Sequence, residues 1–332
     1  MKKILILAFS LYSLSSFCQN TNSPIIKEIL EKVKEHYVDK DLYKKLDSEV
    51  QLKNLESLNG KNLAEELTKQ LTTISQDQHF FVKYLENFNP EKQKDAKEIL
   101  KSNNFHNSLE NFGFENVRRL DGNIGYINFK GFAEPSSSSK TLESAMNFVA
   151  NTNSLIIDLR ENRGGDNGML LLFCSYFFKD KANLYSTYFR DKGKTVENNT
   201  ESKVSGQKYL NKKIYILTSK YSFSAAEGLA YFLKAYQLAQ VIGENTGGAA
   251  NPVDEFIIGN KYLLVVPVGK ITAKKTVGNW EHTGVSPDIK TTSEKAFKTA
   301  HLLALKDILK NKVQTELSEN ELENLIRQLE KE

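Results

Sequence analysis

The sequence has few cysteines and no long apolar run beyond its first residues. Only Cys18 and Cys174 occur in 332 residues, and their spacing fits neither a disulfide framework nor a zinc site. After the N-terminus, no apolar run reaches the ~18 residues that a membrane-spanning helix needs. No Gly-Lys-Ser/Thr ending follows a glycine-rich turn, which argues against a phosphate loop. The expected class is a soluble protein without metal or organic cofactors.

An excess of charge of one sign is also lacking. The formal net charge is +4, and Lys2 and Lys3 supply two of those charges. The remaining charges are mixed in sign along the chain. Such a weak and dispersed balance argues against a nucleic-acid partner.

The first 18 residues have the pattern of a signal peptide. Met1, Lys2 and Lys3 form a positive start, and residues 4–14 are apolar but too short to span a bilayer comfortably. Residues 1–18 are therefore predicted to be removed, which makes the protein periplasmic or secreted. A lipid anchor on Cys18, which would tether the protein to a membrane, and a buried N-terminal helix are the alternatives.

The spacing of apolar residues predicts helices over residues 25–75 and a polar connection over residues 86–112. From about residue 118, short β-rich runs alternate with helices, which is typical of an α/β core. The predicted units are a helical domain with its connection over 19–115, a core over 116–310 and a C-terminal helix over 311–332. Residues 187–211 are mostly polar and are interpreted as a surface excursion.

A glycine pair follows the predicted strand 155–159. The segment 158–165 reads Asp-Leu-Arg-Glu-Asn-Arg-Gly-Gly. Glycines allow backbone conformations with positive φ and a close approach of a ligand to N–H groups. The segment can therefore be a tight turn or a loop that presents an N–H to a developing oxyanion.

Ser224 follows another predicted strand, 214–217, and begins the predicted helix 224–236. Ser224 and Glu227 have the spacing of a capping box, so Ser224 can be a helix N-cap. The N-terminus of a helix also stabilises negative charge, which suits a nucleophile. The N–H of Ala225 would then point at the same oxyanion as the glycine loop.

A serine nucleophile needs a base, and the spacing of the five histidines does not choose between His79 and His282. Each of them can equally have a structural role. A third group must orient the imidazole, and Glu281 is a candidate, although it can also be a surface carboxylate. Cys174 lies in an apolar stretch and is interpreted as a small core residue.

The chain resembles the tail-specific (C-terminal-processing) serine peptidase family. It is most similar to the branch that includes the repeats of interphotoreceptor retinoid-binding protein, and its core to that of tricorn-type peptidases. The resemblance covers roughly residues 25–300 and rests on several motifs in the same order. These motifs are residues 122–126, 158–165, 217–227, 243–248, 279–281 and 284–288.

The resemblance implies a serine peptidase acting on peptides or proteins, with Ser224 as nucleophile. It places the oxyanion donors at the N–H of Ala225 and of Gly164 or Gly165. The lysine of a Ser-Lys dyad would fall at Ala249, so the implied arrangement is Ser-His-Glu.

The resemblance selects His79, in Asp77-Gln78-His79, as the base and Glu281 as its partner. Gln78, His282 and Arg163 depart from the family pattern, in which glycine is usual at the first two positions. The implied fold is mixed α/β, a crotonase-like ββα spiral core with a small N-terminal helical domain and no PDZ domain. A non-catalytic module that binds retinoids, other lipids or peptides is the alternative function on the same fold.

Overall fold

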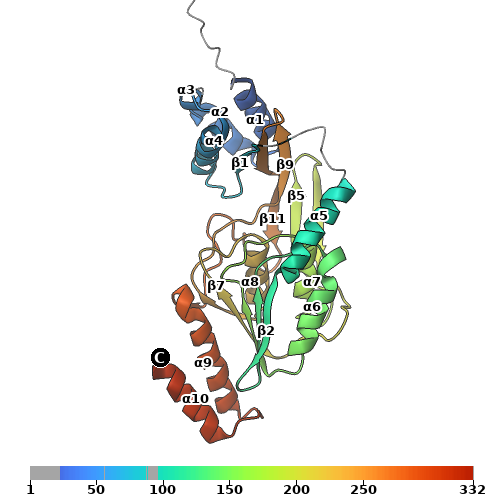
Figure 1. The fold of residues 1–332 in the computed structure, drawn as a ribbon, viewed down its shortest axis with the longest axis vertical. Coiled ribbons are helices and arrows are strands. Elements are labelled where there is room, and N and C mark those ends of the chain that lie inside the picture. Colours follow the sequence, from blue (N-terminus) through green and yellow to red (C-terminus); the bar gives the residue numbers. More distant parts are fainter. Residues whose placement is uncertain (1–22, 56, 87, 89–95, 332) are drawn as a thin grey trace, which may run out of the picture.

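The computed structural model describes residues 23–55, 57–86, 88 and 96–331. The predicted signal peptide, including Cys18, lies outside these residues. None of the helices in these residues combines the length and the apolar character that a membrane span requires. Figure 1 shows a small helical unit at one end, a central α/β core and a pair of helices at the other end.

The core is built on a six-stranded sheet with the order β12-β8-β7-β4-β3-β2. Five of its strands are parallel, and β2 pairs antiparallel with β3 at one edge. The strands are β2 (Phe114–Leu120), β3 (Ile124–Phe129), β4 (Ser154–Asp158), β7 (Lys213–Thr218), β8 (Gln240–Gly243) and β12 (Ile289–Lys290). All five residues of β4 are buried, which fits the apolar run 155–157 at its centre.

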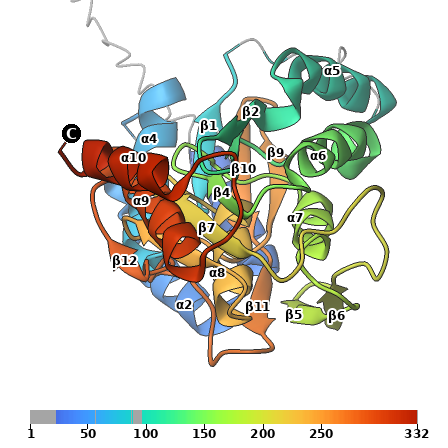
Figure 2. The same cartoon turned by 90° about the horizontal axis from the view of Figure 1, so that it is seen from below.

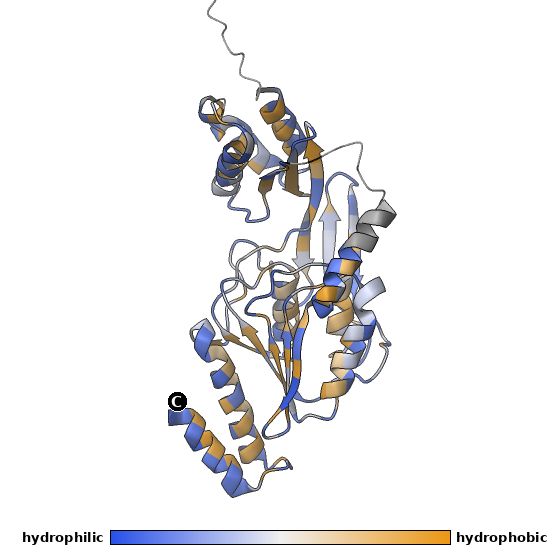
Figure 3. Ribbon diagram, in the orientation of Figure 1, coloured by the Kyte–Doolittle hydropathy of each residue, from blue (hydrophilic) through white to orange (hydrophobic). Residues whose placement is uncertain are grey.

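Helices cover both faces of this sheet. One face packs against α6 (Pro135–Val149), α7 (Asn167–Ser175) and α8 (Ala225–Ala235), and the other against α9 (Ser293–Asn311) and α10 (Glu319–Lys331). Leu155 and Ile157 of β4 point to the first group, whereas Ile156 points to the second. Figure 2 shows α9 and α10 on the opposite side of the sheet from α6 and α7. The apolar stripes of α9 and α10 are visible in Figure 3.

The helical unit takes strands from a distant part of the chain. Its helices are α1 (Ser23–His36), α2 (Lys40–Glu49), α3 (Leu52–Leu55) and α4 (Gly60–Ser75). They pack on a sheet of order β1-β10-β9, formed by β1 (Phe81–Tyr84), β9 (Val253–Ile258) and β10 (Tyr262–Pro267). A buried cluster that includes Leu67, Val82 and Leu264 joins these elements. The helical unit, which carries His79, is thus built from residues that precede and residues that follow Ser224 in the sequence.

The predicted surface excursion 187–211 contains regular structure in its first part, and most of its β6 residues are exposed. Residues there form the end of β5 (Asn183–Phe189) and all of β6 (Lys194–Asn199), which pair as an antiparallel hairpin. With β11 (Gly269–Ala273) they make a third sheet. The polar sequence reflects a strand with one exposed face. Helix α5 (Ala96–Leu109) likewise lies in the stretch read as a connection, followed by the short 3-10 helix η2 (Asn111–Gly113). The mixed α/β class predicted from the sequence is confirmed.

Candidate active site

Ser224 stands on a strained turn between β7 and α8. Its backbone angles are φ 53° and ψ −117°, a conformation that favours glycine and costs energy for other residues. Such strand-to-helix turns expose a serine hydroxyl at the top of a sheet. The side chain is half-buried and faces a cavity of about 680 Å³. Ser224 therefore combines a strained backbone with a side chain that lines a cavity.

The side chain of Glu227 holds this turn in place through hydrogen bonds. Its carboxylate is buried and accepts hydrogen bonds from the Ser224 N–H (2.8 Å), the Thr246 hydroxyl (2.5 Å), and the N–H groups of Gly248 (2.7 Å) and Ala249 (3.0 Å). Burial raises the pKa of Glu227, and the hydrogen bonds work against that rise. The glutamate thus ties the segment 246–249 to the serine turn. Sequence spacing indicated only the bond to Ser224.

The glycine pair lies directly against the serine. A Cβ on Gly164 would come within 2.8 Å of the Ser224 Cβ and 2.9 Å of the Ala225 nitrogen, and one on Gly165 within 2.2 Å of the Phe132 oxygen. Their φ angles of 91° and 136° also favour glycine. The two predicted motifs are therefore brought together, at distances that no larger residue would allow.

The two glycines differ in the state of their N–H groups. The N–H of Gly164 donates to Asn162 Oδ1 at 2.8 Å. Across the described parts of the chain, the N–H groups of Gly165 and Ala225 make no hydrogen bond. Both residues line the cavity that Ser224 faces. Of the two glycines considered from the sequence, only Gly165 has a free N–H.

His79 reaches the same cavity from the helical unit. It lies in the turn between α4 and β1, and its side chain is 9% exposed. Its ring packs edge-on against Phe223, the residue before the serine, with centroids 5.1 Å apart. Burial lowers the pKa of His79 to about 4. A neutral imidazole is the form that can accept a proton.

Glu281 lies close to His79. Its Oε2 accepts hydrogen bonds from the N–H groups of Ala250 (2.7 Å) and Asn251 (2.8 Å), and its side chain is 9% exposed. Burial, and then the charge of nearby Asp77, raise the pKa of Glu281 to about 7. One side-chain atom each of Asp77, His79 and Glu281 lie within 4.8 Å of one another. The predicted histidine and glutamate therefore converge.

Asp77 also belongs to this group, although no role of its own was assigned to it from the sequence. It is fully buried, and its Oδ1 accepts the backbone N–H of His79 at 3.0 Å and lies 3.7 Å from the ring atom Nδ1 of His79. The amide of Asn251 donates to its Oδ2 at 3.5 Å. Asp77 and Asn251 are 174 residues apart in the sequence, so local sequence patterns do not predict their contact.

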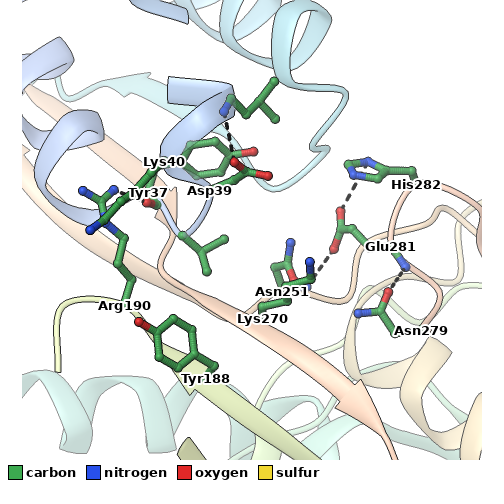
Figure 4. A pocket seen from close by; sticks show the side chains of 12 residues that line it. Tyr37, Asp39, Lys40, Tyr188, Arg190, Asn251, Lys270, Asn279, Glu281 and His282 are labelled. Atoms are coloured by element: carbon green, nitrogen blue, oxygen red, sulfur yellow. Dashed lines mark hydrogen bonds and ion pairs between the residues drawn. The ribbon is translucent and has the colours of Figure 1, made fainter. Parts of the chain in front are cut away.

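His282 occupies a different environment. Its side chain is 47% exposed, and its Nδ1 is 2.8 Å from the Gln76 carbonyl oxygen and 3.8 Å from Glu281 Oε1. It lines a second cavity of about 660 Å³, shown in Figure 4, together with Glu281 and Asn251. His79, and not His282, lines the cavity of Ser224. The structure thus separates two histidines that residue spacing left equal.

The two cavities lie on opposite faces of the β5–β11 sheet. Thr187 and Phe189 line the Ser224 cavity, whereas the alternating residues Tyr188 and Arg190 line the second. Of the remaining departures, Arg163 places its guanidinium over the Phe223 ring at 5.3 Å, and Gln78 is exposed. Cys174 is fully buried in the core, as expected from its sequence context.

The fold is shared with solved structures of low sequence identity. A candidate peptidase from Parabacteroides merdae has 18% identity and a TM-score of 0.59, over 85% of this chain and 96% of that one. A lipoprotein from Streptococcus agalactiae has 16% identity and a TM-score of 0.56, over 92% and 100%. The tricorn protease has 11% identity and a TM-score of 0.50, over 92% of this chain and 36% of its own. At these identities, the likeness establishes the fold.

The family is established by the sequence pattern of peptidase family S41, which matches residues 123–291. This stretch contains the glycine pair, Ser224 and Glu281. It confirms the resemblance to tail-specific peptidases that the sequence motifs indicated. Because the match spans just over half of the chain, the chain belongs to peptidase family S41 and is a serine-type peptidase.

Proposed function

We propose that the protein hydrolyses peptide bonds through an acyl-enzyme on Ser224, with His79 as general base and Glu281 as the partner of His79. The observation that carries this proposal is the strained Ser224 turn in one cavity with His79. The substrates would be peptides or proteins whose chain enters this cavity.

In the first step, Ser224 Oγ attacks the scissile carbonyl carbon while His79 takes the hydroxyl proton. Because Nδ1 of His79 lies 3.7 Å from Asp77 Oδ1, Nε2 is the nitrogen that would accept this proton. The imidazolium then gives the proton to the leaving amine. Water repeats the sequence on the ester, which releases the second product and restores Ser224.

The oxyanion would be held by the N–H groups of Gly165 and Ala225. Both residues line the cavity, and their N–H groups make no hydrogen bond to the described residues, whereas the Gly164 N–H already donates to Asn162. Gly164 would instead allow the close packing of the loop on the serine. A donor of this kind contributes about 2.7–4 kcal/mol to lowering the barrier.

The carboxylate of Glu281 would stabilise the positive charge of the His79 imidazolium. Its Oε2 is held by two backbone N–H groups, so its position is fixed before substrate binds. Asp77 adds a second carboxylate next to the same ring. The pair favours the charged form of His79 at the moment of proton transfer.

A fluorophosphonate probe tests the proposal, because such probes react with activated serine hydroxyls. We expect labelling of the wild type, none of Ser224→Ala, and full labelling of Ser144→Ala, whose hydroxyl lies on the exposed side of α6. Equal labelling of the wild type and both variants, or no labelling of any of the three proteins, would contradict the proposal. Stoichiometric binding of a retinoid or another lipid by an unlabelled protein would favour the binding module.

Export of the protein remains part of the proposal and rests on residues 1–18. N-terminal sequencing and intact mass of protein from the producing cell test it. A mature chain that begins near residue 19 supports a cleaved signal peptide in a periplasmic or secreted protein, and a lipid-modified Cys18 supports an anchor. A chain that keeps residues 1–18 would contradict both.

A further inference from the structure

Two carboxylates and an imidazole lie together behind the serine, and all three are nearly inaccessible to solvent. Asp77, His79 and Glu281 have side-chain exposures of 1%, 9% and 9%. In the described parts of the chain, neither carboxylate forms an ion pair with a lysine or arginine. Buried carboxylates without a cationic partner are costly unless a proton or a cation compensates their charge.

Three polar atoms in this group have no hydrogen-bond partner. Seven buried side-chain nitrogen and oxygen atoms lack one in the described residues, and three of them are His79 Nδ1, Glu281 Oε1 and Asn251 Oδ1. Asn251 adjoins the group through its amide nitrogen, which lies 3.5 Å from Asp77 Oδ2, so its Oδ1 would face the group if the amide turned over. Buried polar groups are nearly always satisfied, so several unsatisfied atoms in one place indicate a ligand shared among them.

We propose that Asp77, His79 and Glu281 form a binding site for a single Zn²⁺ ion, with Asn251 Oδ1 as a fourth ligand once its amide has turned over. The donor set is one imidazole nitrogen with carboxylate oxygens, which suits zinc better than the all-oxygen sets of Mg²⁺ and Ca²⁺. The two carboxylates would balance the charge of the ion.

The geometry requires only small movements. Ligands at zinc distances in a tetrahedron lie about 3.3–3.6 Å apart. His79 Nδ1 and Asp77 Oδ1 are 3.7 Å apart. One possible ligand atom from each of the three residues lies within 4.8 Å of the other two. Backbone hydrogen bonds hold the other oxygen of Glu281 and the Oδ1 of Asp77, which orients both carboxylates.

Zinc at this site regulates the peptidase, and this part of the inference rests on the proposed function. An ion bound to His79 Nδ1 and Glu281 would prevent the ring from becoming an imidazolium stabilised by that carboxylate. The Ser224 proton would then have no acceptor of adequate basicity. Zn²⁺ is therefore a reversible inhibitor, and a chelator restores activity.

Calorimetric titration of the EDTA-treated full chain with ZnCl₂, and with MgCl₂ for comparison, tests the site. We expect one Zn²⁺ per chain and no comparable Mg²⁺ binding. Asp77→Asn and His79→Ala should each weaken the affinity by more than the roughly 10- to 100-fold that the loss of an outer-shell partner causes. His106→Ala, which removes an exposed histidine on α5, should leave it unchanged. Thermal unfolding of each variant checks that it is folded.

Two results would overturn the site: no stoichiometric Zn²⁺ binding by folded wild type, or binding that Asp77→Asn and His79→Ala leave unchanged. The first result would mean that protons or water satisfy these atoms. The Ser224→Ala variant separates this inference from the proposed function, because it should bind Zn²⁺ as the wild type does. Zn²⁺ binding that leaves fluorophosphonate labelling unchanged would contradict the inhibitory role alone.

Discussion

At the residue scale, Gly164 shows how much of the site depends on the absence of a side chain. The glycine pair was visible in the sequence, and its spacing after a strand predicted a loop of special conformation. Its partner was not visible, because Ser224 lies 60 residues further along the chain. The same limit applies to Asp77 and Asn251, whose contact joins the helical unit to the segment after β8.

Gly164→Ala should disable the site through a clash. The new methyl group would approach the Phe223 oxygen and the Ser224 Cβ to 2.8 Å, so the serine turn must move. Fluorophosphonate labelling should fall by more than about tenfold. Gly193→Ala is the matched control, because Gly193 also has a positive φ (56°) but no atom within 4 Å of an added Cβ. It should cost only about 1 kcal/mol of unfolding free energy and leave labelling intact. Equal labelling of the two variants would contradict the packing argument.

Glu281 should control the pH dependence of the reaction. Burial raises its pKa to about 7, and its charged form stabilises the imidazolium of His79. The carboxylate ionises as pH rises, so kcat/KM of EDTA-treated protein on a fluorogenic peptide should increase through about pH 7. Glu281→Gln should remove this limb and lower kcat/KM by about 10²- to 10⁴-fold. An unchanged limb in the variant would show that another group controls it.

At the scale of elements, apolar periodicity placed most of the helices and the buried strands. The prediction of helix 224–236 corresponds to α8 with its two capping residues, and strand 214–217 to most of β7. The β5–β6 hairpin was missed because its polar outer face has the composition of a loop. The structure shows that its inner face is buried, with Tyr185 and Thr187 as examples. Alternation on one strand is a weak signal when the sheet has few strands.

Two glutamates close similar turns at the N-termini of two helices, and they should differ in importance. Glu227 Oε2 and Glu321 Oε2 each accept a serine N–H at 2.8 Å. Only Glu227 is buried and accepts three further hydrogen bonds that join another loop. Glu227→Ala should lower the free energy of unfolding by about 3–5 kcal/mol and abolish labelling. Glu321→Ala should cause a much smaller loss and normal labelling. Similar urea midpoints for the two variants would contradict this difference.

At the scale of the whole molecule, the active site depends on how the helical unit meets the core. The sequence predicted a separate N-terminal helical domain. In the structure, β9 and β10 from residues 253–267 complete that unit, and β1 pairs with β10. Such long-range strand pairing has no local signal. It brings His79 from the beginning of the chain to Ser224 in the core.

Arg190 should hold the two parts together. Its guanidinium, on the loop between β5 and β6, donates to the Tyr37 carbonyl at 2.5 Å and the Lys34 carbonyl at 2.9 Å, at the end of α1. Arg190→Ala should therefore speed amide hydrogen exchange in α1–α4 while exchange in β4 and β7 stays unchanged. Lys192→Ala is the control, since that lysine lies in the same loop, with its ammonium 5.2 Å from the Phe189 ring, and its side chain forms no ion pair with the described residues. Uniform acceleration, or none, in the arginine variant would contradict the tether.

The central claim is that a substrate acyl group is transferred to Ser224. Rapid-quench mass spectrometry of a reaction with an activated peptide ester, followed by peptide mapping, measures this transfer directly. The account predicts an acyl group on Ser224 in the wild type, with a slower appearance in His79→Ala. Product formation without an adduct on Ser224, or an adduct on another residue at the same rate, would contradict it.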